Sequence, residues 1–229
     1  AYEMLRSLVG SEMCIRDSLN SLMQHNLQRK NMSFSQSYLD QTSQITNSID
    51  ARILENIAEE LSSLRERKGR LFFIGSGGGA GHSSHAVCDF RKIGSIECYT
   101  PSDNVSELTA RVNDDGWDTA YSNWLKVSNF NSNDAIFVFS VGGGSKDKNI
   151  SVNLVNCISL ANDLGASVMG VVGRDGGFTK ESSDLTMVIP TMDENLVTPH
   201  TEGWQAVVWH LLISHPLVGI NETKWESTK

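Results

Sequence analysis

The sequence predicts an α/β protein with a doubly wound, mostly parallel five-stranded sheet that is flanked by helices. Short apolar segments at 71–74, 96–99, 135–139, 167–172 and 185–189 alternate with longer stretches of helical periodicity. Within these segments apolar and polar residues scarcely alternate, as is typical of parallel strands buried on both faces. Glycine-rich loops follow three of them, at 75–81, 141–145 and 173–177. In such sheets the loops after the strands bind ligands.

The segment before the first strand divides into two parts, of which the second is predicted to be helical. Residues 1–18 are expected to be an artefactual or disordered extension, because 7–18 resembles a translated sequencing-adapter read and lacks the layout of a signal peptide. A short helix is the alternative, since Met4, Leu5, Leu8 and Val9 have helical spacing. Residues 19–69 are predicted to form N-terminal helices, the sheet domain to span 70–218, and 219–229 to form a tail.

Between residues 34 and 67, apolar side chains recur at steps of three and four, which predicts an amphipathic helix or a helix pair. Such a stripe belongs either to the core or to an oligomer interface. Both interpretations stay open from the sequence.

Composition limits the class of protein. A chain of 229 residues suits one well-buried domain. Its net charge of −8 and pI near 5.2 argue against nucleic acid or an anionic membrane surface as partner. The four cysteines form no Cys-x-x-Cys pair, and no apolar run of bilayer-spanning length occurs. The sequence therefore predicts a reduced, cytoplasmic protein.

The first glycine-rich loop, at 75–81, has the pattern of a phosphate cradle. It lies between an apolar strand and the polar start of a helix, where free backbone N–H groups and the helix dipole favour an anion. His82 follows Gly81 where a Walker A loop needs lysine, so that class is excluded. A Rossmann dehydrogenase is disfavoured, because the next strand ends at Thr100 and Pro101 without a ribose-binding acid. Any one glycine loop is more often a structural turn.

Five motifs together resemble the sugar isomerase (SIS) domain of phosphoheptose isomerases, which are also called sedoheptulose 7-phosphate isomerases. In chain order they are Gly75-Ser76-Gly77-Gly78 with His85 and Asp89, the segment 113–117, the segment 140–145, the segment 173–177, and Glu202 with His210. The resemblance covers roughly residues 34–214.

This resemblance implies the interconversion of sedoheptulose 7-phosphate and D-glycero-D-manno-heptose 7-phosphate by proton transfer through an enediol. Asp89 would be the base, and His210 the complementary acid and base. A divalent metal, zinc above all, would be held by His85, Asp89, Glu202 and His210. The implied substrate-binding residues are Ser76, Gly77, Gly78, Asn113, Asp114, Ser140, Gly142, Gly143, Ser145 and Glu202. The implied partners are a phosphorylated sugar and three further copies, in a homotetramer with sites at subunit interfaces.

The spacing of the candidate residues supports part of this arrangement. His85 and Asp89 are four residues apart and therefore share one helix face. Taken singly, His85 could be a hydrogen-bonded core histidine, and Asp89 a solvated acid. Glu202 and His210 lie about 12 Å apart along a helix axis, so one small ion contacts both only through long side-chain reach.

The sequence also departs from the family at several positions. Asp89 stands where the family has Glu, which shortens the carboxylate by one methylene, and Glu202 replaces Gln, which adds a negative charge. Both changes favour a bound cation. Val141 and a glycine replace hydroxyl residues in the second loop, so that backbone amides, Ser140 and Ser145 must bind the phosphate.

Two alternatives to the heptose enzyme stay open. One is a non-catalytic SIS-domain adaptor or a sugar-phosphate-binding regulatory protein, and the other is an isomerase of a different phosphosugar. The survival of four polar candidates in changed form favours an enzyme.

Overall fold

The structure is a computed structural model that describes residues 32–222, so the predicted extension at 1–18 lies outside the described residues. The chain divides into two compact units, with the boundary between Asn47 and Ser48. In the described part of the first unit, α2 (Phe34–Ser48) is a regular helix. The hydroxyls of Thr42 and Thr46 donate to carbonyl oxygens one turn earlier in it.

The second unit is built on a parallel sheet. Within the described residues it has five strands in the order β2-β1-β3-β4-β5, and every neighbouring pair is parallel. The strands are β1 (Leu71–Gly75), β2 (Cys98–Tyr99), β3 (Ala135–Ser140), β4 (Ser167–Val172) and β5 (Thr186–Val188). The predicted doubly wound α/β fold is therefore confirmed, with β2 and β5 shorter than the sequence indicated.

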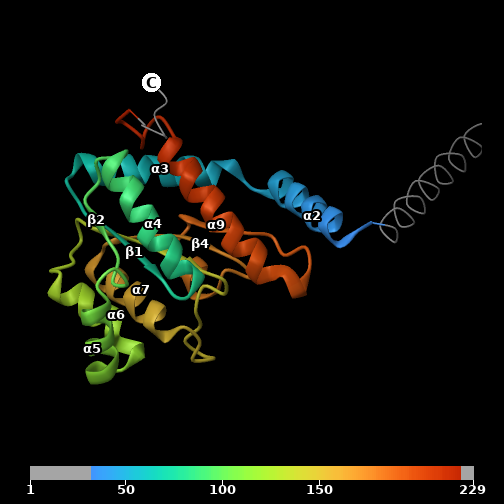
Figure 1. Cartoon of the computed structure of the whole chain (residues 1–229). Helices are drawn as coiled ribbons and strands as arrows, with labels where there is room; N and C mark the ends of the chain where they lie inside the picture. Colours follow the sequence, from blue (N-terminus) through green and yellow to red (C-terminus); the bar gives the residue numbers. More distant parts are fainter. Residues whose placement is uncertain (1–31, 223–229) are drawn as a thin grey trace, which may run out of the picture. The chain divides into compact units, whose positions relative to one another are not determined.

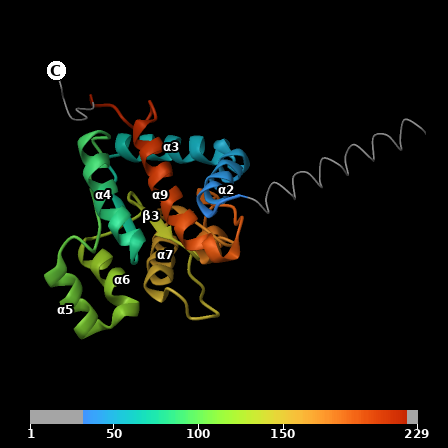
Figure 2. The ribbon, with the colours of Figure 1, turned by 45° about the vertical axis from the view of Figure 1, so that its right-hand side comes forward.

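Helices cover both faces of this sheet (Figures 1 and 2). They are α3 (Ala51–Glu66), α4 (Gly78–Lys92), α5 (Val105–Asp115), α6 (Trp117–Val127), α7 (Val152–Leu164), α8 (Gly177–Ser182), the 3-10 helix η1 (Glu194–Leu196) and α9 (Val197–Ser214). In both views α4 and α9 lie side by side on one face, with α3 crossing near their ends. Helices α6 and α7 pack together on the other face. None of the helices in residues 32–222 has the length and apolar character needed to span a bilayer.

The core fills both faces of the sheet, which explains the continuous apolar runs of its strands. On β1, Phe72 and Ile74 join a cluster with the residues of α6 and α7. The intervening Phe73 packs on the opposite face, where its ring meets Phe90 of α4 at a centroid distance of 5.2 Å. Because successive side chains of a strand point to opposite faces, β1 is anchored in both layers.

The strand order places a crevice at the carboxyl ends of β1 and β3. From β1 the chain continues to β2 on one side, and the later strands β3, β4 and β5 add on the other side. Such a switch point is where doubly wound sheets bind ligands. Here β1 ends at Gly75 and β3 ends at Ser140, so the first two glycine-rich loops meet at this point.

Candidate active site

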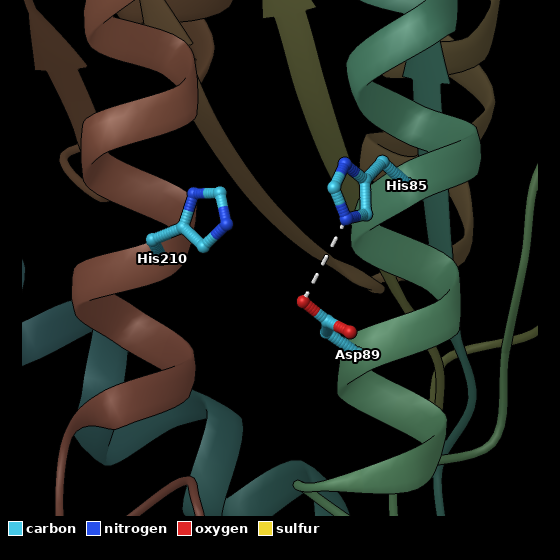
Figure 3. A group of neighbouring side chains, drawn as sticks. All are labelled: His85, Asp89 and His210. Carbon is cyan, nitrogen blue, oxygen red and sulfur yellow. Dashed lines mark ion pairs between the residues drawn. The ribbon is translucent and has the colours of Figure 1, made fainter. Parts of the chain in front are cut away.

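Three of the predicted site residues come together between α4 and α9. Helix α4 carries His85 and Asp89, one turn apart, and α9 carries His210 (Figure 3). One donor atom from each residue lies within 4.8 Å of the others. His85 Nε2 is 4.0 Å from Asp89 Oδ2, and Figure 3 shows the His210 ring facing this pair from the neighbouring helix. We call these residues the His–Asp–His cluster.

The two helices orient the cluster by burying their apolar faces. On α4, Ala86 and Phe90 are fully buried, which leaves His85 and Asp89 on the side that faces α9. On α9, Trp209 is almost fully buried, and its ring lies 4.7 Å from that of His85. The packing therefore fixes the helix rotation, and the helix rotation fixes which polar groups meet.

The protonation geometry of His210 follows from its backbone contact. Its Nδ1 lies 2.8 Å from the carbonyl oxygen of Ala206. Since a carbonyl oxygen only accepts, Nδ1 carries the hydrogen, and Nε2 of the neutral ring presents its lone pair. His210 thus offers a base or a metal ligand whose tautomer is set by its own helix.

Asp89 is the buried member of the cluster. Its side chain is only 8% exposed, whereas that of His85 is 61% exposed. Asp89 Oδ2 is buried and has no hydrogen-bond partner among the described residues. Since a buried carboxylate oxygen without a partner is costly, this atom is suited to receive a cation or a substrate proton.

The donor set fits a divalent metal. Two imidazole nitrogens and one carboxylate form the ligand set of many catalytic zinc sites, which leave a further position open. The same donors also suit Mn²⁺ and Fe²⁺. The unpartnered Oδ2 of Asp89 supports this fit, because a cation would satisfy it.

Glu202 belongs to α9, and its carboxylate lies apart from the cluster, beside the first residue of α4. A Cβ atom added to Gly78 would be 2.5 Å from Glu202 Cδ and 2.6 Å from both carboxylate oxygens. The carboxylate therefore fills the space that the missing side chain of Gly78 leaves. The structure thus brings together three of the four predicted metal ligands and places the fourth beside the first glycine-rich loop.

His82 is a residue at this site that the sequence analysis did not assign. It is half-buried between the loop and the cluster, and its ring lies 6.2 Å from that of Phe139. Burial lowers the pKa of His82, and the nearby Glu202 carboxylate opposes this shift. The sequence could have indicated His82, because His82, His85 and Asp89 follow one another at steps of three and four residues. In a helix this spacing puts all three on one face.

A cavity of about 1220 Å³ opens at the carboxyl ends of the strands. Of the predicted substrate-binding residues, it is lined by Ser76, Ser140, Gly142 and Ser145. The described cavity wall does not include the other predicted substrate-binding residues, which are Gly77, Gly78, Asn113, Asp114, Gly143 and Glu202. Asn113 and Asp114 lie exposed at the end of α5, where Asn113 Nδ2 donates to Asp114 Oδ1 at 2.8 Å. Arg174 lines the cavity and was not assigned from the sequence.

Three of the four serine side chains that line this cavity share one hydrogen-bonding pattern, in which the serine oxygen accepts a bond from the protein. The three bonds are Asn153 Nδ2 to Ser76 Oγ at 3.0 Å, Gly143 N to Ser140 Oγ at 3.1 Å, and Lys148 N to Ser145 Oγ at 3.3 Å. A hydroxyl that accepts in this way still has its own hydrogen to donate. The cavity wall is therefore a set of hydroxyl donors suited to an anion.

Gly143 holds two of the glycine-rich loops together, and its replacement tests their packing. Its φ is +69°, and an added Cβ would overlap the carbonyl oxygen of Gly176. We expect Gly143→Ala to lower the free energy of unfolding by about 2 kcal/mol or more, because backbone strain and a clash combine. Urea denaturation of both proteins measures this difference.

Gly142→Ala is the matched control for this experiment. A Cβ at Gly142 would have Arg174 Cδ, 3.7 Å away, as its nearest neighbour, and no positive φ is involved. Its expected effect is within about 0.5 kcal/mol. Equal destabilisation by the two substitutions would contradict the proposed loop packing.

Comparison with known sequences identifies related proteins, although no family model matches the chain. It is 31% identical over 154 residues to the lincomycin biosynthesis protein LmbN of Streptomyces lincolnensis. This match covers 63% of this chain and 54% of LmbN. It is 27% identical over 152 residues to a phosphoheptose isomerase of Helicobacter pylori, covering 64% of this chain and 73% of that protein. A phosphoheptose isomerase of Aliarcobacter butzleri is 25% identical over 185 residues, and the match covers 74% of this chain and 88% of that protein. The chain thus spans about half the length of LmbN.

Solved structures with the same fold include two phosphoheptose isomerases. That of Neisseria gonorrhoeae has a TM-score of 0.62 at 19% identity, covering 77% of this chain and 93% of that one. That of Francisella tularensis has a TM-score of 0.63 at 17% identity, covering 86% and 94%. The Vibrio vulnificus NanR protein, solved in complex with ManNAc-6P, has a TM-score of 0.53 at 15% identity, and the match covers 88% of this chain and 69% of NanR. At these identities the likeness concerns the fold.

Proposed function

We propose, on the premise that this chain belongs with the SIS-domain phosphoheptose isomerases, that it is an enzyme that interconverts a ketose phosphate and an aldose phosphate. The observation that carries the proposal is the meeting of Asp89 and His210 across α4 and α9. One provides a carboxylate oxygen without a partner, and the other an imidazole nitrogen with a free lone pair. Aldose–ketose isomerisation needs a base and an acid placed in this way.

The substrate's phosphate would bind in the cavity at the strand ends. Its wall presents the hydroxyls of Ser76, Ser140 and Ser145, which suit an anion. From Gly78, which lies in the first glycine-rich loop and begins α4, the chain rises about 10 Å along the helix to His85. An extended sugar phosphate bridges such a distance, so its carbonyl end would reach the cluster while its phosphate stays in the cavity.

In the proposed reaction Asp89 removes the proton from the carbon beside the carbonyl group. The electron pair of the broken C–H bond forms the carbon–carbon double bond and leaves the former carbonyl oxygen as the anion of the enediol. His210 Nε2 takes the proton of the neighbouring hydroxyl group and delivers it to this oxygen, and Asp89 returns its own proton to the neighbouring carbon, which leaves a new carbonyl group on the first carbon. The sum is an isomerisation without net gain or loss of protons.

The His–Asp–His cluster would also hold a divalent metal, for which zinc is our proposal. Because Nδ1 of His210 is engaged by Ala206, Nε2 would be the ligand atom, and in the metal-bound form this replaces its proton-transfer role. When bound, such an ion polarises the substrate carbonyl and stabilises negative charge on its oxygen. Asp89 has two carboxylate oxygens, so one can contact the ion while the other accepts the carbon-bound proton. His85 is then a ligand, and its imidazole needs no proton-transfer role.

We further propose that the sugar is sedoheptulose 7-phosphate, that its product is D-glycero-D-manno-heptose 7-phosphate, and that the enzyme works in the cytoplasm as a homotetramer. The exposure of His85 and His210 supports the tetramer, because a single chain leaves this side of the cluster open to solvent. A neighbouring subunit would exclude water from the proton-transfer groups.

The direct test is incubation of the protein with sedoheptulose 7-phosphate in D₂O, followed by proton NMR. We expect the aldose phosphate to appear, with deuterium at the carbon that receives the solvent-exchanged proton. Ketose phosphates of five and six carbons serve as comparison substrates, and preferential turnover of one of them would replace the heptose assignment. Binding of phosphosugars without turnover or deuterium exchange of any of them would contradict an enzyme and favour the regulatory alternative.

A further inference from the structure

A fully buried amide lies behind the cavity wall. Asn153 is the second residue of α7, and its exposed fraction is 0%. Its Nδ2 donates to Ser76 Oγ at 3.0 Å, while its Oδ1 is buried without a hydrogen-bond partner among the described residues. Burying an amide whose oxygen lacks a partner costs free energy. An apolar residue would fill this position more favourably, so the amide has a use other than packing.

That use is found at Ser76, which the amide contacts. Ser76 follows β1 directly and lines the cavity. Because its oxygen accepts from Asn153, its hydroxyl hydrogen must point elsewhere. Within the protein, Tyr121 is a hydrogen-bond partner of Ser76: burial raises the pKa of Tyr121, the bond with Ser76 opposes this rise, and the pKa is about 12. The Tyr121 hydroxyl itself donates to the carbonyl oxygen of Gly75 at 3.0 Å.

This arrangement fixes the direction of each hydrogen bond around Ser76. An amide nitrogen can donate but cannot accept, so Asn153, whose Nδ2 faces Ser76, does not take the Ser76 proton in this arrangement. A negatively charged ligand oxygen in the cavity would compete with the neutral Tyr121 oxygen for that proton, and charge-assisted bonds are the stronger ones. Ser140 and Ser145 are oriented by backbone N–H groups instead, so Asn153 is the side chain in this set that mutation can change.

We propose that Asn153 is a positioning residue, which orients the Ser76 hydroxyl so that it donates to the phosphate group of the substrate. This inference rests on the proposed binding of a phosphosugar in the cavity. It assigns a role to α7 that no motif of the sequence indicated.

Replacing Asn153 by aspartate tests the direction of the bond with little change in shape. A carboxylate accepts the Ser76 proton, so Ser76 no longer donates to the ligand. We expect the dissociation constant of inorganic phosphate for Asn153→Asp, measured by calorimetry, to rise about tenfold or more. In turnover assays KM for the sugar phosphate should rise by a similar factor, while kcat changes little.

The charge that Asn153→Asp introduces also repels phosphate, and a double-mutant cycle separates this effect from the hydrogen bond. In a Ser76→Ala background, Asn153→Asp can act only through charge, so its effect on the dissociation constant should be clearly smaller. Asn156→Asp is the matched control. It makes the same change one turn later in α7, where Asn156 Nδ2 donates to the carbonyl oxygen of Asp118 at 2.8 Å, and we expect unchanged phosphate affinity.

Equal effects of Asn153→Asp with and without Ser76 would overturn the positioning role, as would unchanged phosphate affinity in the single variant. If circular dichroism shows that Asn153→Asp does not fold, the same cycle with Asn153→Ala, which removes the donor without a charge, takes its place and must show coupling to Ser76. Failure of the proposed reaction is distinguishable from these results, because phosphate binding is measured without turnover.

Discussion

The Asp89→Asn protein is expected to lose isomerase turnover by a factor of about 10² to 10⁴, the usual contribution of a positioned proton-transfer group. An amide has nearly the same shape as a carboxylate but cannot accept the proton from carbon. The fold should tolerate the change, because the buried Oδ2 has no hydrogen-bond partner in the described structure to lose. The measurement is kcat for the ketose phosphate, with thermal denaturation as a check on folding.

Asp89→Glu is the informative companion variant. It keeps the carboxylate and gives the longer side chain that the resemblance to the phosphoheptose isomerases implies for this position. We expect it to retain far more activity than Asp89→Asn, even if the longer side chain fits its buried position poorly. Full turnover by Asp89→Asn would exclude Asp89 as the base and would direct attention to Glu202 and His82 beside the first glycine-rich loop.

Loss of bound metal is the second large effect that we expect. The protein, purified and supplied with Zn²⁺, should contain about one ion per chain, and His85→Ala should contain almost none, since two protein ligands rarely retain zinc. The side chain of His85 is 61% exposed, so its truncation should change folding stability little. Mass spectrometry of the metal content of both proteins decides the question.

His215→Ala provides the control for this experiment. His215 is a histidine outside the cluster, with Nε2 3.1 Å from Glu55 Oε2, and its replacement should leave the metal content unchanged. Equal metal content in the wild-type protein and His85→Ala would contradict the metal site. A wild-type protein that stays free of metal would also contradict it and would leave the base and acid roles of Asp89 and His210 to be tested alone.

The sheet could be predicted from the sequence because each strand is buried on both faces. Continuous apolar runs indicated β1, β3 and β4 with ends that differ by at most one residue. The strands β2 and β5 were predicted too long, at 96–99 and 185–189, and both lie at the edges of the sheet. An edge strand has a neighbour on one side only. Apolar residues at its ends can therefore be buried without hydrogen bonding to another strand, and the apolar run is longer than the strand.

The candidate site was predictable only where its residues are close in sequence. His85 and Asp89 share a helix face because they are four residues apart. His210 meets them from a distant helix, and the resemblance to a family, not the spacing, indicated it. The bond between Asn153 and Ser76 spans 77 positions, and no local pattern marks it. The position of Glu202 depends on the missing side chain of Gly78, which is a property of the folded packing.

The contact between Trp209 and His85 gives the molecule its own optical reporter. The indole ring lies 4.7 Å from the imidazole that would bind the ion, and it is shielded from solvent by its burial. Open-shell ions such as Co²⁺ or Cu²⁺ quench the fluorescence of an indole at such short range, whereas Zn²⁺, with its filled d shell, does not. Occupation of the cluster by different ions can therefore be followed through the light that the protein emits, without any added dye.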